Sequence, residues 1–541
     1  MRFKSVLFIT FLVMLLTLLG CGKDKGANEE GKSRLDNLNT ESEMPIVKDQ
    51  IKLNIFANQA PTTADDWNDI MIFNEYEKMT NIDVEWQMVP VEGMEEKRNL
   101  VLAGGEDLPD AFWGTGMPSG DLLKHGQQGL FIPLNDLIDE HAPNLKKIFD
   151  DYPDLKKGIT ASDGNIYAFP RYYEPEFTSV HLGSRLWIRE DWLEALDMAS
   201  PTTTEEFYQY LKAVKETDLN GNGIHDEIPY GGTSMTSLVN GLRGSFGLGN
   251  RGTKHANIDI DPETEDTLRF IPTTDEYKQL LEYLNKLYSE ELIEQNIYTV
   301  ETSQFLANGS EGLYGSTNYY SPDMLFDGDI GENYIGAEAL EGPNGDRLYS
   351  AVTSSVVGLG NFVITNANEN PEATVRWVDY FYGDEGSELY FMGFEGVTFE
   401  RDSDGNAVYL DEILNSPDGK TVEQELIKYL TFPGGGSPSI IREEYFMGAE
   451  NSEMSNEQAE KVEPYLIDEV WPPFSFTEEE MKKLERVGSD IDKFVSDMRD
   501  KFIVGSESLD DWDKYVKEIE KMGLEDYMEV QKAAYERYKS N

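Results

Sequence analysis

The 541-residue chain has a single cysteine, Cys21, and only five histidines. One cysteine cannot form a disulfide within the chain, so the fold must be stabilised without such bridges. Basic residues are also scarce: 46 lysines and arginines stand against 102 aspartates and glutamates, a net charge of −56. Such a surface repels nucleic acids, anionic lipid headgroups and polyanionic substrates. The charge therefore favours neutral or cationic small molecules as partners, and we expect no nucleic acid.

Motifs that indicate catalysis are lacking as well. The histidines, at positions 125, 141, 181, 225 and 255, show no metal-binding spacing. The chain has no G-x-S-x-G, no phosphate-binding loop and no G-x-G-x-x-G that opens a helix after a strand. We therefore predict that the protein is not an enzyme. Carboxylate pairs are so frequent among 102 acidic residues that they neither support nor exclude a glycoside hydrolase or polysaccharide lyase.

The N-terminus has the layout of a secretory signal. Arg2 and Lys4 precede an apolar run over residues 6–19, shorter than the roughly 20 residues of a membrane-spanning helix. The run ends in LLGC, which resembles the lipobox cleaved by the lipoprotein signal peptidase. The resemblance implies that residues 1–20 are removed and that Cys21 becomes a lipid-modified N-terminus; a short membrane anchor that ends in cysteine is the alternative. Residues 21–50, polar and nearly free of aromatics, are predicted to form a flexible tether.

The chain as a whole has the composition of a folded protein, with 39% hydrophobic and 11% aromatic residues. Alternating patterns predict strands at 51–57 and 82–90, with a helix between them, which is typical of a parallel α/β lobe. The middle is predicted to be helix-rich, with helices at 201–217 and 274–293. Strand-like and helical patterns return over 351–383, and the tail from residue 477 is predicted to be helical almost throughout.

Six segments, in order, resemble a known protein family. They are LAGGEDLPDAFWG, GLFIPLNDLIDEHAPNLKKIF, DGNIYAFP, LWIREDWLEALDMASPTTTEEFYQYLKAVK, DLNGNGIHDEIP and KFIVGSESLDDWDKYVKEIEKMGL. Together these segments are similar to the extracellular solute-binding lipoproteins of bacterial ABC importers, in the long branch related to alginate- and other oligosaccharide-binding proteins. The likeness spans residues 50–540, essentially the whole mature chain.

The resemblance implies an α/β, two-lobed periplasmic-binding-protein type II fold with a hinge, a ligand cleft between discontinuous lobes and a helix-rich C-terminal region. We expect residues 51–178 and 333–383 to form the N-terminal lobe, and residues 179–332 and 384–541 the C-terminal lobe. The resemblance also implies that the protein is a monomer, that its partner is an ABC permease, and that it is attached to the membrane through the lipid anchor only. The tether and the acidic surface favour the outer face of a Gram-positive cell membrane.

The segment DLNGNGIHDEIP has the spacing of a calcium loop. Oxygen-bearing side chains alternate along it, and Gly223 permits the tight turn that the first half of an EF-hand loop requires. The expected ligands are Asp218, Asn220, Asn222, the carbonyl of Ile224, Asp226 and Glu227. Position 12 of the loop is Pro229, where an EF-hand has a bidentate glutamate. The resemblance to oligosaccharide-binding lipoproteins implies that Glu227, at position 10, takes the role of that glutamate here. We predict structural calcium; an Asx-rich turn without an ion is the alternative.

Sugar recognition needs flat apolar faces together with planar polar groups. The candidates at the expected lobe edges and crossings are Trp67, Trp113, Arg171, Tyr172, Tyr173, Glu174, Tyr319, Tyr320 and Phe394. Each of them could instead be an ordinary core or surface residue. Trp187 and Trp192, at helical spacing with apolar neighbours, are predicted to be core. Arg171 and Arg243 are candidates for a carboxylated sugar, although the acidic surface favours neutral sugars.

The leading functional hypothesis is therefore a lipid-anchored binding protein that captures an oligosaccharide and delivers it to a permease. A cleft poor in aromatics and rich in backbone pairing edges would favour peptides instead. A surface carbohydrate-active enzyme and a calcium-dependent adhesin remain the alternatives from other classes.

Overall fold

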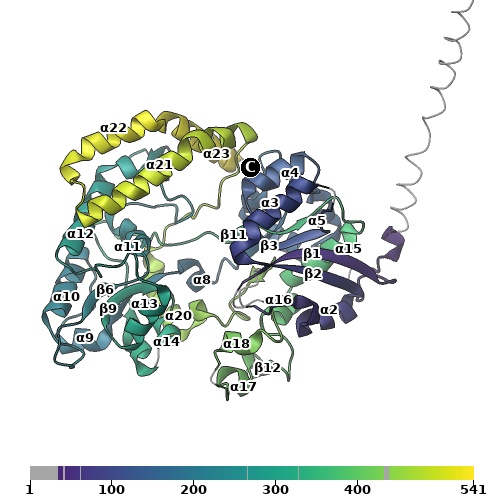
Figure 1. Cartoon of the computed structure of the whole chain (residues 1–541), viewed down its shortest axis with the longest axis horizontal. Coiled ribbons are helices and arrows are strands. Elements are labelled where there is room, and N and C mark those ends of the chain that lie inside the picture. Colours follow the sequence, from purple (N-terminus) through teal and green to yellow (C-terminus); the bar gives the residue numbers. More distant parts are fainter. Residues whose placement is uncertain are drawn as a thin grey trace, which may run out of the picture.

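The computed structural model describes residues 34–40, 43–60, 63–105, 107–264, 266–326, 328–418, 420–431 and 438–540. Cys21, the predicted signal peptide and residues 21–33, 41 and 42 of the predicted tether lie outside these residues. The rest of the segment predicted as a flexible tether instead packs on the first lobe, where Leu38, Ile46 and Val47 are buried in the core. The described chain forms two lobes side by side, each with its own sheet and hydrophobic core (Figure 1). The two-lobed α/β architecture predicted from the sequence is thereby confirmed.

The first lobe is built on a six-stranded sheet in the order β14-β4-β11-β3-β1-β2. Its strands are β1 (Ile51–Gln59), β2 (Ile82–Pro90), β3 (Ala111–Met117), β4 (Phe169–Tyr173), β11 (Val356–Ile364) and β14 (Ile440–Ile441). β1 pairs in parallel with β2 and β3, whereas β11 is antiparallel to β3 and β4. The carboxyl ends of β1, β2 and β3 therefore leave the sheet at one edge, where open α/β sheets usually bind ligands.

Helices cover this sheet and enclose an aromatic core. They are α2 (Met71–Thr80), α3 (Met94–Gly104), α4 (Ser119–Gln127), α5 (Asn135–His141), α6 (Pro143–Asp151), α7 (Pro153–Ile159), α15 (Pro371–Asp379), α16 (Asp384–Phe391), α17 (Asp411–Leu414) and α18 (Val422–Leu426). In the core, the rings of Trp67, Trp86, Trp113 and Trp377 contact one another, with centroids 5.1–6.3 Å apart in the contacting pairs. Half of the tryptophans of the chain therefore pack in the core of this lobe.

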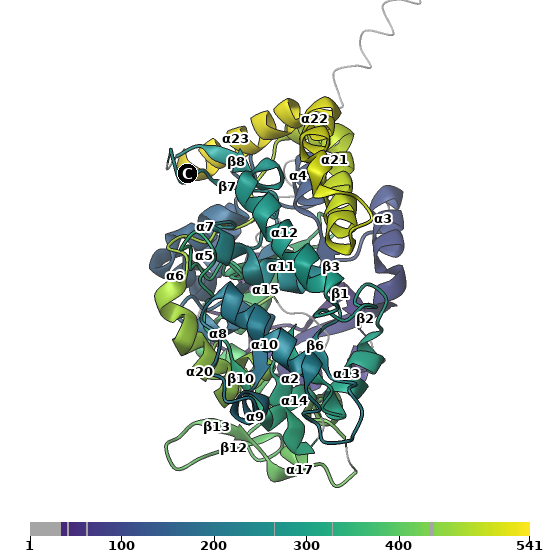
Figure 2. The ribbon, with the colours of Figure 1, turned by 90° about the vertical axis from the view of Figure 1, so that its left-hand side faces the viewer.

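The second lobe contains a four-stranded sheet in the order β10-β5-β9-β6. Its strands are β5 (Arg185–Arg189), β6 (Ile228–Gly231), β9 (Tyr314–Tyr319) and β10 (Tyr334–Gly336). The helices are α9 (Glu190–Ala195), α10 (Thr204–Glu216), α11 (Met235–Leu242), α12 (Asp275–Ser289), α13 (Thr302–Ser310), α14 (Pro322–Leu325), α20 (Glu453–Val462), α21 (Glu478–Val504), α22 (Trp512–Met522) and α23 (Leu524–Ser540). Helices α21–α23, the helix-rich C-terminal region, pass over α11 and α12 (Figures 1 and 2).

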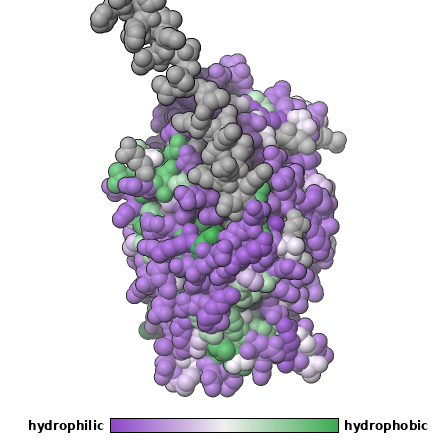
Figure 3. Space-filling model, turned by 90° about the vertical axis from the view of Figure 1, so that its right-hand side faces the viewer, coloured by the Kyte–Doolittle hydropathy of each residue, from purple (hydrophilic) through white to green (hydrophobic). Residues whose placement is uncertain are grey.

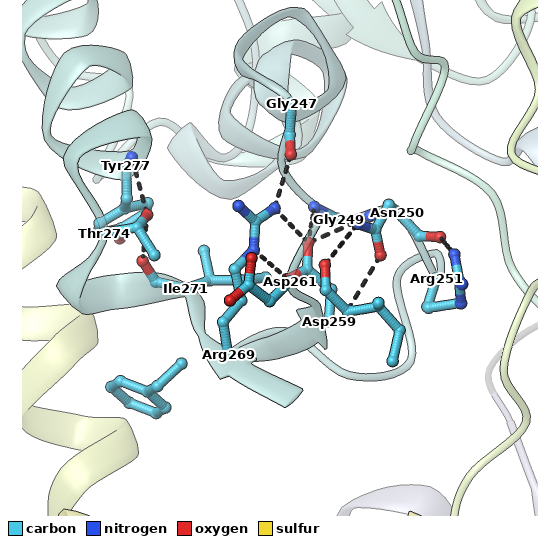
Figure 4. Close-up of polar contacts among 12 residues, drawn as sticks. Gly247, Gly249, Asn250, Arg251, Asp259, Asp261, Arg269, Ile271, Thr274 and Tyr277 are labelled. Atoms are coloured by element: carbon cyan, nitrogen blue, oxygen red, sulfur yellow. Dashed lines mark hydrogen bonds and ion pairs between the residues drawn. The ribbon is translucent and has the colours of Figure 1, made fainter. Parts of the chain in front are cut away.

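A buried ion pair holds a small hairpin in the second lobe, β7 (Ile258–Ile260) and β8 (Leu268–Phe270). Arg269 donates from Nε to Asp259 Oδ1 over 2.6 Å and from Nη2 to Asp259 Oδ2 over 3.0 Å (Figure 4). Its Nη2 also donates to the carbonyl of Gly247, and the backbone N–H of Gly249 donates to Asp259 Oδ2. Asp259 is fully buried; its carboxylate joins the two strands of the hairpin through Arg269 and fastens the hairpin to the turn at 247–250 through the backbone N–H groups of Gly249 and Asn250.

The lobe boundaries differ from those expected. Residues 334–336, expected in the first lobe, form β10 in the second sheet, and the chain rejoins the first sheet only at β11. The described residues between 384 and 446, expected in the second lobe, pack on the core of the first through α16, α17, α18, the hairpin β12 (Phe399–Arg401) and β13 (Ala407–Tyr409), and β14. Lobe membership follows strand pairing and burial between distant segments, for which the local pattern carries no signal.

The surface agrees with the composition. Seen from the side of the first lobe, the described atoms are mostly hydrophilic, with small separate apolar areas (Figure 3). Among the described residues, no helix combines the length and apolarity that crossing a bilayer requires.

Candidate functional site

The predicted calcium loop connects the C-terminus of α10 to the start of β6. Its side chains fold inward onto its own backbone: Gly223 N donates to Asp218 Oδ2 over 2.9 Å, and Asn222 N donates to Asn220 Oδ1 over 3.0 Å. Glu227 Oε1 accepts from the backbone N–H of Leu219 over 2.7 Å. Gly221 and Gly223 both have positive φ, of 71° and 82°, which lets the loop curl tightly.

Two carboxylate oxygens in this loop are left without a donor. Asp218 Oδ1 and Glu227 Oε2 are buried and have no hydrogen-bond partner, although the second oxygen of each carboxylate is held by backbone N–H groups. A buried carboxylate oxygen without a partner is costly. The amide groups of Asn220 and Asn222 are turned to the carboxylate of Asp226 (2.8 and 3.1 Å), so all the predicted side-chain ligands lie within one small loop. This donor set fits a hard cation.

The loop lies at the opposite end of β6 from the gap between the lobes. β6 runs from Ile228, next to the loop, to Gly231, which pairs with Thr317 of β9. The tyrosines that follow Thr317 along β9 therefore lie at the far end of the sheet from the loop. An ion here would fix the connection between α10 and β6 and would not contact a ligand between the lobes.

Three of the predicted cleft residues are buried in the core, and their predicted contact with a ligand is wrong for this conformation. Trp67 and Trp113 are part of the tryptophan cluster of the first lobe, and Trp67 Nε1 donates to Thr63 Oγ1 over 3.0 Å. Tyr172 is fully buried, and its hydroxyl donates to the carbonyl of Leu155. Their rings have no free face. Trp113 and Tyr172 lie within β3 and β4, where alternate side chains point to opposite faces of the sheet, and Trp67 follows the end of β1; all three side chains are packed in the core.

Other predicted residues meet where the chain passes between the lobes. Tyr319 ends β9 and Tyr320 follows it, with their rings edge to face and 5.3 Å apart, and Tyr320 is 43% exposed. Tyr173 ends β4 in the first lobe, and burial raises the pKa of its hydroxyl. The charge of Arg171 opposes this rise in pKa, whereas Glu450 and Tyr320 add to it. Tyr173 of the first lobe thus lies within electrostatic range of Arg171 on the same strand and of Tyr320 from the second lobe. Arg171 Nε is buried there without a hydrogen-bond partner.

Glu174 and Phe394 have other surroundings. Glu174 accepts from Arg442 Nη1 over 3.4 Å and from the backbone N–H of Glu443 over 3.2 Å, so it ties two crossing segments together. Phe394 lies in the turn after α16, where its backbone N–H donates to Thr398 Oγ1, and its ring packs against the core of the first lobe. Neither belongs to the group around Tyr320.

The crossing segments are hydrogen-bonded to one another next to this group. α8 (Thr178–Leu182) carries His181, whose Nδ1 lies 3.0 Å from the carbonyl oxygen of Thr353 and whose Nε2 lies 3.1 Å from that of Glu174. Tyr173 N donates to the carbonyl of Ser355 over 2.9 Å. Ser179 Oγ donates to the carbonyl of Glu450, which connects the third crossing segment. The passage between the lobes is therefore one connected structure.

Several polar residues at strand ends are further candidates for ligand contacts that were not predicted from the sequence. Asn58 Oδ1 at the end of β1 and Thr115 Oγ1 near the end of β3 are buried without a partner, and so is Asn318 Nδ2 in β9. Unpaired buried polar groups at the carboxyl ends of strands are candidates for ligand contacts. The signal available in the sequence was their position at the end of a predicted strand, which holds for Asn58 after the strand at 51–57.

Comparisons with known proteins agree with this architecture. Over 99% of its length the chain is 29% identical to the fructooligosaccharide ABC transporter substrate-binding protein FusA of Streptococcus pneumoniae, of which the match covers 98%. The structure of FusA in complex with kestose has a TM-score of 0.73 at 27% identity and covers 91% of this chain and 100% of that one. An EF-hand mutant of FusA in complex with fructo-nystose gives 0.73 at 26% identity, with the same coverage.

The lipoprotein LipO of Bacillus subtilis is 24% identical over 84% of each chain. The model of the bacterial extracellular solute-binding protein family matches residues 60–388, more than half of the chain. This chain is therefore a member of the bacterial extracellular solute-binding protein family.

Proposed function

We propose that this protein is the lipid-anchored substrate-binding component of an ABC importer, and that it captures a neutral oligosaccharide between its two lobes. The observation that carries the proposal is the convergence of tyrosines from both lobes, Tyr173 and Tyr320, next to the crossing segments. A sugar ring that stacks on an exposed tyrosine hides apolar C–H surface, while its hydroxyls pair with planar polar groups such as Asn58 or Arg171.

The mechanism is closure of the lobes on the ligand. Because the ligand contacts both lobes only when they are close, it binds the closed form more tightly and shifts the equilibrium toward it. The hydrogen-bonded crossing segments around His181 are the natural pivot. No chemical step is needed, and the closed form is what an ABC permease would recognise.

The ligand class is taken from the relatives. FusA, which matches nearly the whole chain, is a fructooligosaccharide-binding protein, and one of its structures contains kestose. The net charge of −56 also favours a neutral ligand. We therefore place fructooligosaccharides first among the neutral sugars to be tested.

The test is a thermal-shift screen of the chain from residue 22 onward, with calcium, against fructooligosaccharides, other neutral oligosaccharides, uronate oligosaccharides and short peptides. A ligand of the folded state at 100 times its dissociation constant stabilises by about 2.7 kcal/mol. A shift with one neutral oligosaccharide class, without consumption of the sugar, supports the proposal. A shift with peptides only, slow disappearance of the sugar, or no response to any small ligand would instead indicate a peptide-binding protein, an enzyme or an adhesin.

Replacing Tyr320 by alanine is expected to weaken oligosaccharide binding about tenfold, since a stacking face worth about 1.4 kcal/mol is lost. The free energy of unfolding should hardly change, because the ring is 43% exposed. Tyr298→Ala is the matched control, since Tyr298 is similarly exposed (40%) but lies beside Asp500 of α21. Isothermal titration calorimetry measures both; equal affinities for wild type and Tyr320→Ala would remove Tyr320 from the site.

We further propose that the loop 218–227 holds a structural calcium ion, with Asp218, Asn220, Asn222, Asp226 and Glu227 as side-chain ligands and Ile224 as the backbone ligand. The two partnerless carboxylate oxygens, Asp218 Oδ1 and Glu227 Oε2, support this, and so does the EF-hand named in FusA. When bound, the ion would neutralise the clustered carboxylates and fix the loop between α10 and β6.

Removing calcium with EGTA is expected to lower the unfolding temperature of the wild type, and Glu227→Gln should lose most of this calcium-dependent gain. The amide oxygen of glutamine can still accept from Leu219 N and Asn220 N, so the variant keeps the loop while losing one charge. Glu216→Gln, an exposed residue at the end of α10, is the control. Identical unfolding curves with calcium and with EGTA for the wild type would contradict the ion site.

The lipid anchor remains a proposal from the sequence, because Cys21 lies outside the described residues. Its support is the LLGC pattern at positions 18–21 and the similarity to the lipoprotein LipO. We propose that the protein, as a monomer, is held on the outer face of the cell membrane of a Gram-positive bacterium by this anchor alone, and that it works with an ABC permease there.

A further inference from the structure

A cavity of about 640 Å³ is lined mostly by residues of the second lobe, together with Ser119 at the start of α4 in the first lobe. Its lining residues come from α11, from the segment that leads into β7, and from α21 and α23. The residues of α21 that line it, Asp492, Val495, Ser496 and Arg499, follow helical spacing and so form one face of that helix. The volume is in the range of small-molecule sites.

Two cations face this cavity without a carboxylate partner. Arg243 is only 5% exposed, and its single hydrogen bond runs from Nη2 to the carbonyl of Ala256 over 2.9 Å. Lys254 Nζ has one long contact, 3.4 Å, with the carbonyl of Val357. Within the described part of the chain neither residue forms an ion pair, and burial lowers the pKa of both.

The carboxylates nearby are already engaged. Asp259 is bound by Arg269, and Asp500 accepts from Arg499 Nε over 2.8 Å. Asp492, the remaining acid in the cavity wall, accepts from Asn257 Nδ2 over 2.7 Å, and burial raises its pKa. The cavity therefore carries an excess of positive charge, in a protein whose net charge is −56. A buried cation without a partner is costly unless something else compensates it.

The other walls suit a sugar ring. The ring of His255 lies over that of Phe474, with centroids 4.1 Å apart, and His255 Nε2 donates to the carbonyl of Pro472, which leaves Nδ1 as an acceptor in the neutral form. Tyr277 also lines the cavity, and burial raises its pKa to about 12, against the opposing charges of Arg499 and Arg243. Flat faces with planar polar groups are typical of carbohydrate sites.

We propose that this cavity binds a monosaccharide that carries a carboxylate or a phosphate, with Lys254 and Arg243 pairing the anionic group and the aromatic wall contacting the ring. This site goes beyond the oligosaccharide capture proposed above and does not depend on which oligosaccharide the gap between the lobes takes. An anion here would supply the acceptors that the two cations lack in the protein itself.

The test is calorimetric titration of the same protein, from residue 22 onward, with D-galacturonate and D-glucose 6-phosphate, and with D-galactose and D-glucose as their neutral counterparts. We expect an acidic sugar to bind at least about tenfold more tightly than its neutral counterpart. The two arms distinguish a carboxylate from a phosphate. Absence of binding of both acids at about 10 mM, or equal binding of acidic and neutral sugars, would overturn the proposal.

Lys254→Met is the diagnostic variant, because methionine keeps much of the aliphatic stem and removes only an unpaired charge. It should weaken the acidic sugar about tenfold or more while leaving the unfolding temperature without sugar unchanged or raised. Lys97→Met, at an exposed position on α3, removes the same charge elsewhere and should have no effect. Unchanged affinity in Lys254→Met, or a large loss of stability without sugar, would show that the lysine serves the fold and not a ligand.

Discussion

Replacing Trp113 by alanine is expected to lower the free energy of unfolding by about 3–5 kcal/mol. The side chain is fully buried, and its ring contacts those of Trp67, Phe73, Trp86, Phe362, Trp377, Phe381 and Tyr390, with centroids 5.5–6.3 Å away. Those neighbours come from several helices and strands of the first lobe, so they cannot collapse into the space left by the indole. Urea denaturation of wild type and variant measures the loss.

The same substitution separates packing from ligand contact. Below its unfolding temperature, Trp113→Ala should bind the oligosaccharide with a dissociation constant within about twofold of the wild type, because the indole has no face toward the gap. Tyr320→Ala should show the opposite pattern, with weakened binding and preserved stability. If Trp113→Ala instead kept its stability and lost binding, the buried placement of Trp113 would be refuted and its role in the cleft restored.

Replacing Asp259 by alanine is expected to cost about 3–5 kcal/mol, because it leaves the guanidinium of Arg269 buried without its counter-ion. The pair is bidentate, at 2.6 and 3.0 Å, and the same carboxylate holds the backbone N–H of Gly249 (Figure 4). The hairpin β7–β8 and the turn at 247–250 would lose their connection together. Denaturation followed by a probe in the second lobe measures the effect.

Two further variants sharpen this test. Glu338→Ala breaks a partly exposed ion pair, Arg347 with Glu338 at 2.7 Å, and should cost less than about 1 kcal/mol. The double variant Asp259→Leu with Arg269→Met removes both charges at once and should be more stable than Asp259→Ala. If Asp259→Ala cost no more than Glu338→Ala, the pair would be solvated in solution and its burial would be contradicted.

Local features were predictable because neighbours along the chain decide them. The residue pattern over 201–217 predicts a helix. In the structure α10 spans Thr204–Glu216, with Thr203 and Glu206 in a reciprocal capping box. The calcium-loop residues likewise lie within ten positions of one another, so their spacing alone brings their oxygens together. Trp187 and Trp192 are buried as predicted, although Trp187 lies on strand β5 and not on a helix.

The cleft was less predictable than the loop. Trp113 lies within β3 and Tyr320 directly follows β9, and both are aromatic, yet Trp113 is fully buried and Tyr320 is 43% exposed. The difference arises because Trp113 meets partners up to 277 positions further along the chain, such as Tyr390, which no local pattern contains. The polar strand-end residues Asn58 and Asn318 were overlooked for the same reason.

The sequence by itself determined the α/β composition, the acidic charge, the helices with their caps and the gathering of oxygen-bearing side chains in the loop at 218–227, since these depend on neighbours along the chain. Only the tertiary structure decided which lobe holds residues 384–446, which tyrosines meet beside the crossing segments, and that Arg243 and Lys254 share one cavity. These features depend on how apolar surface is buried between distant segments, because that burial fixes the positions of the polar side chains.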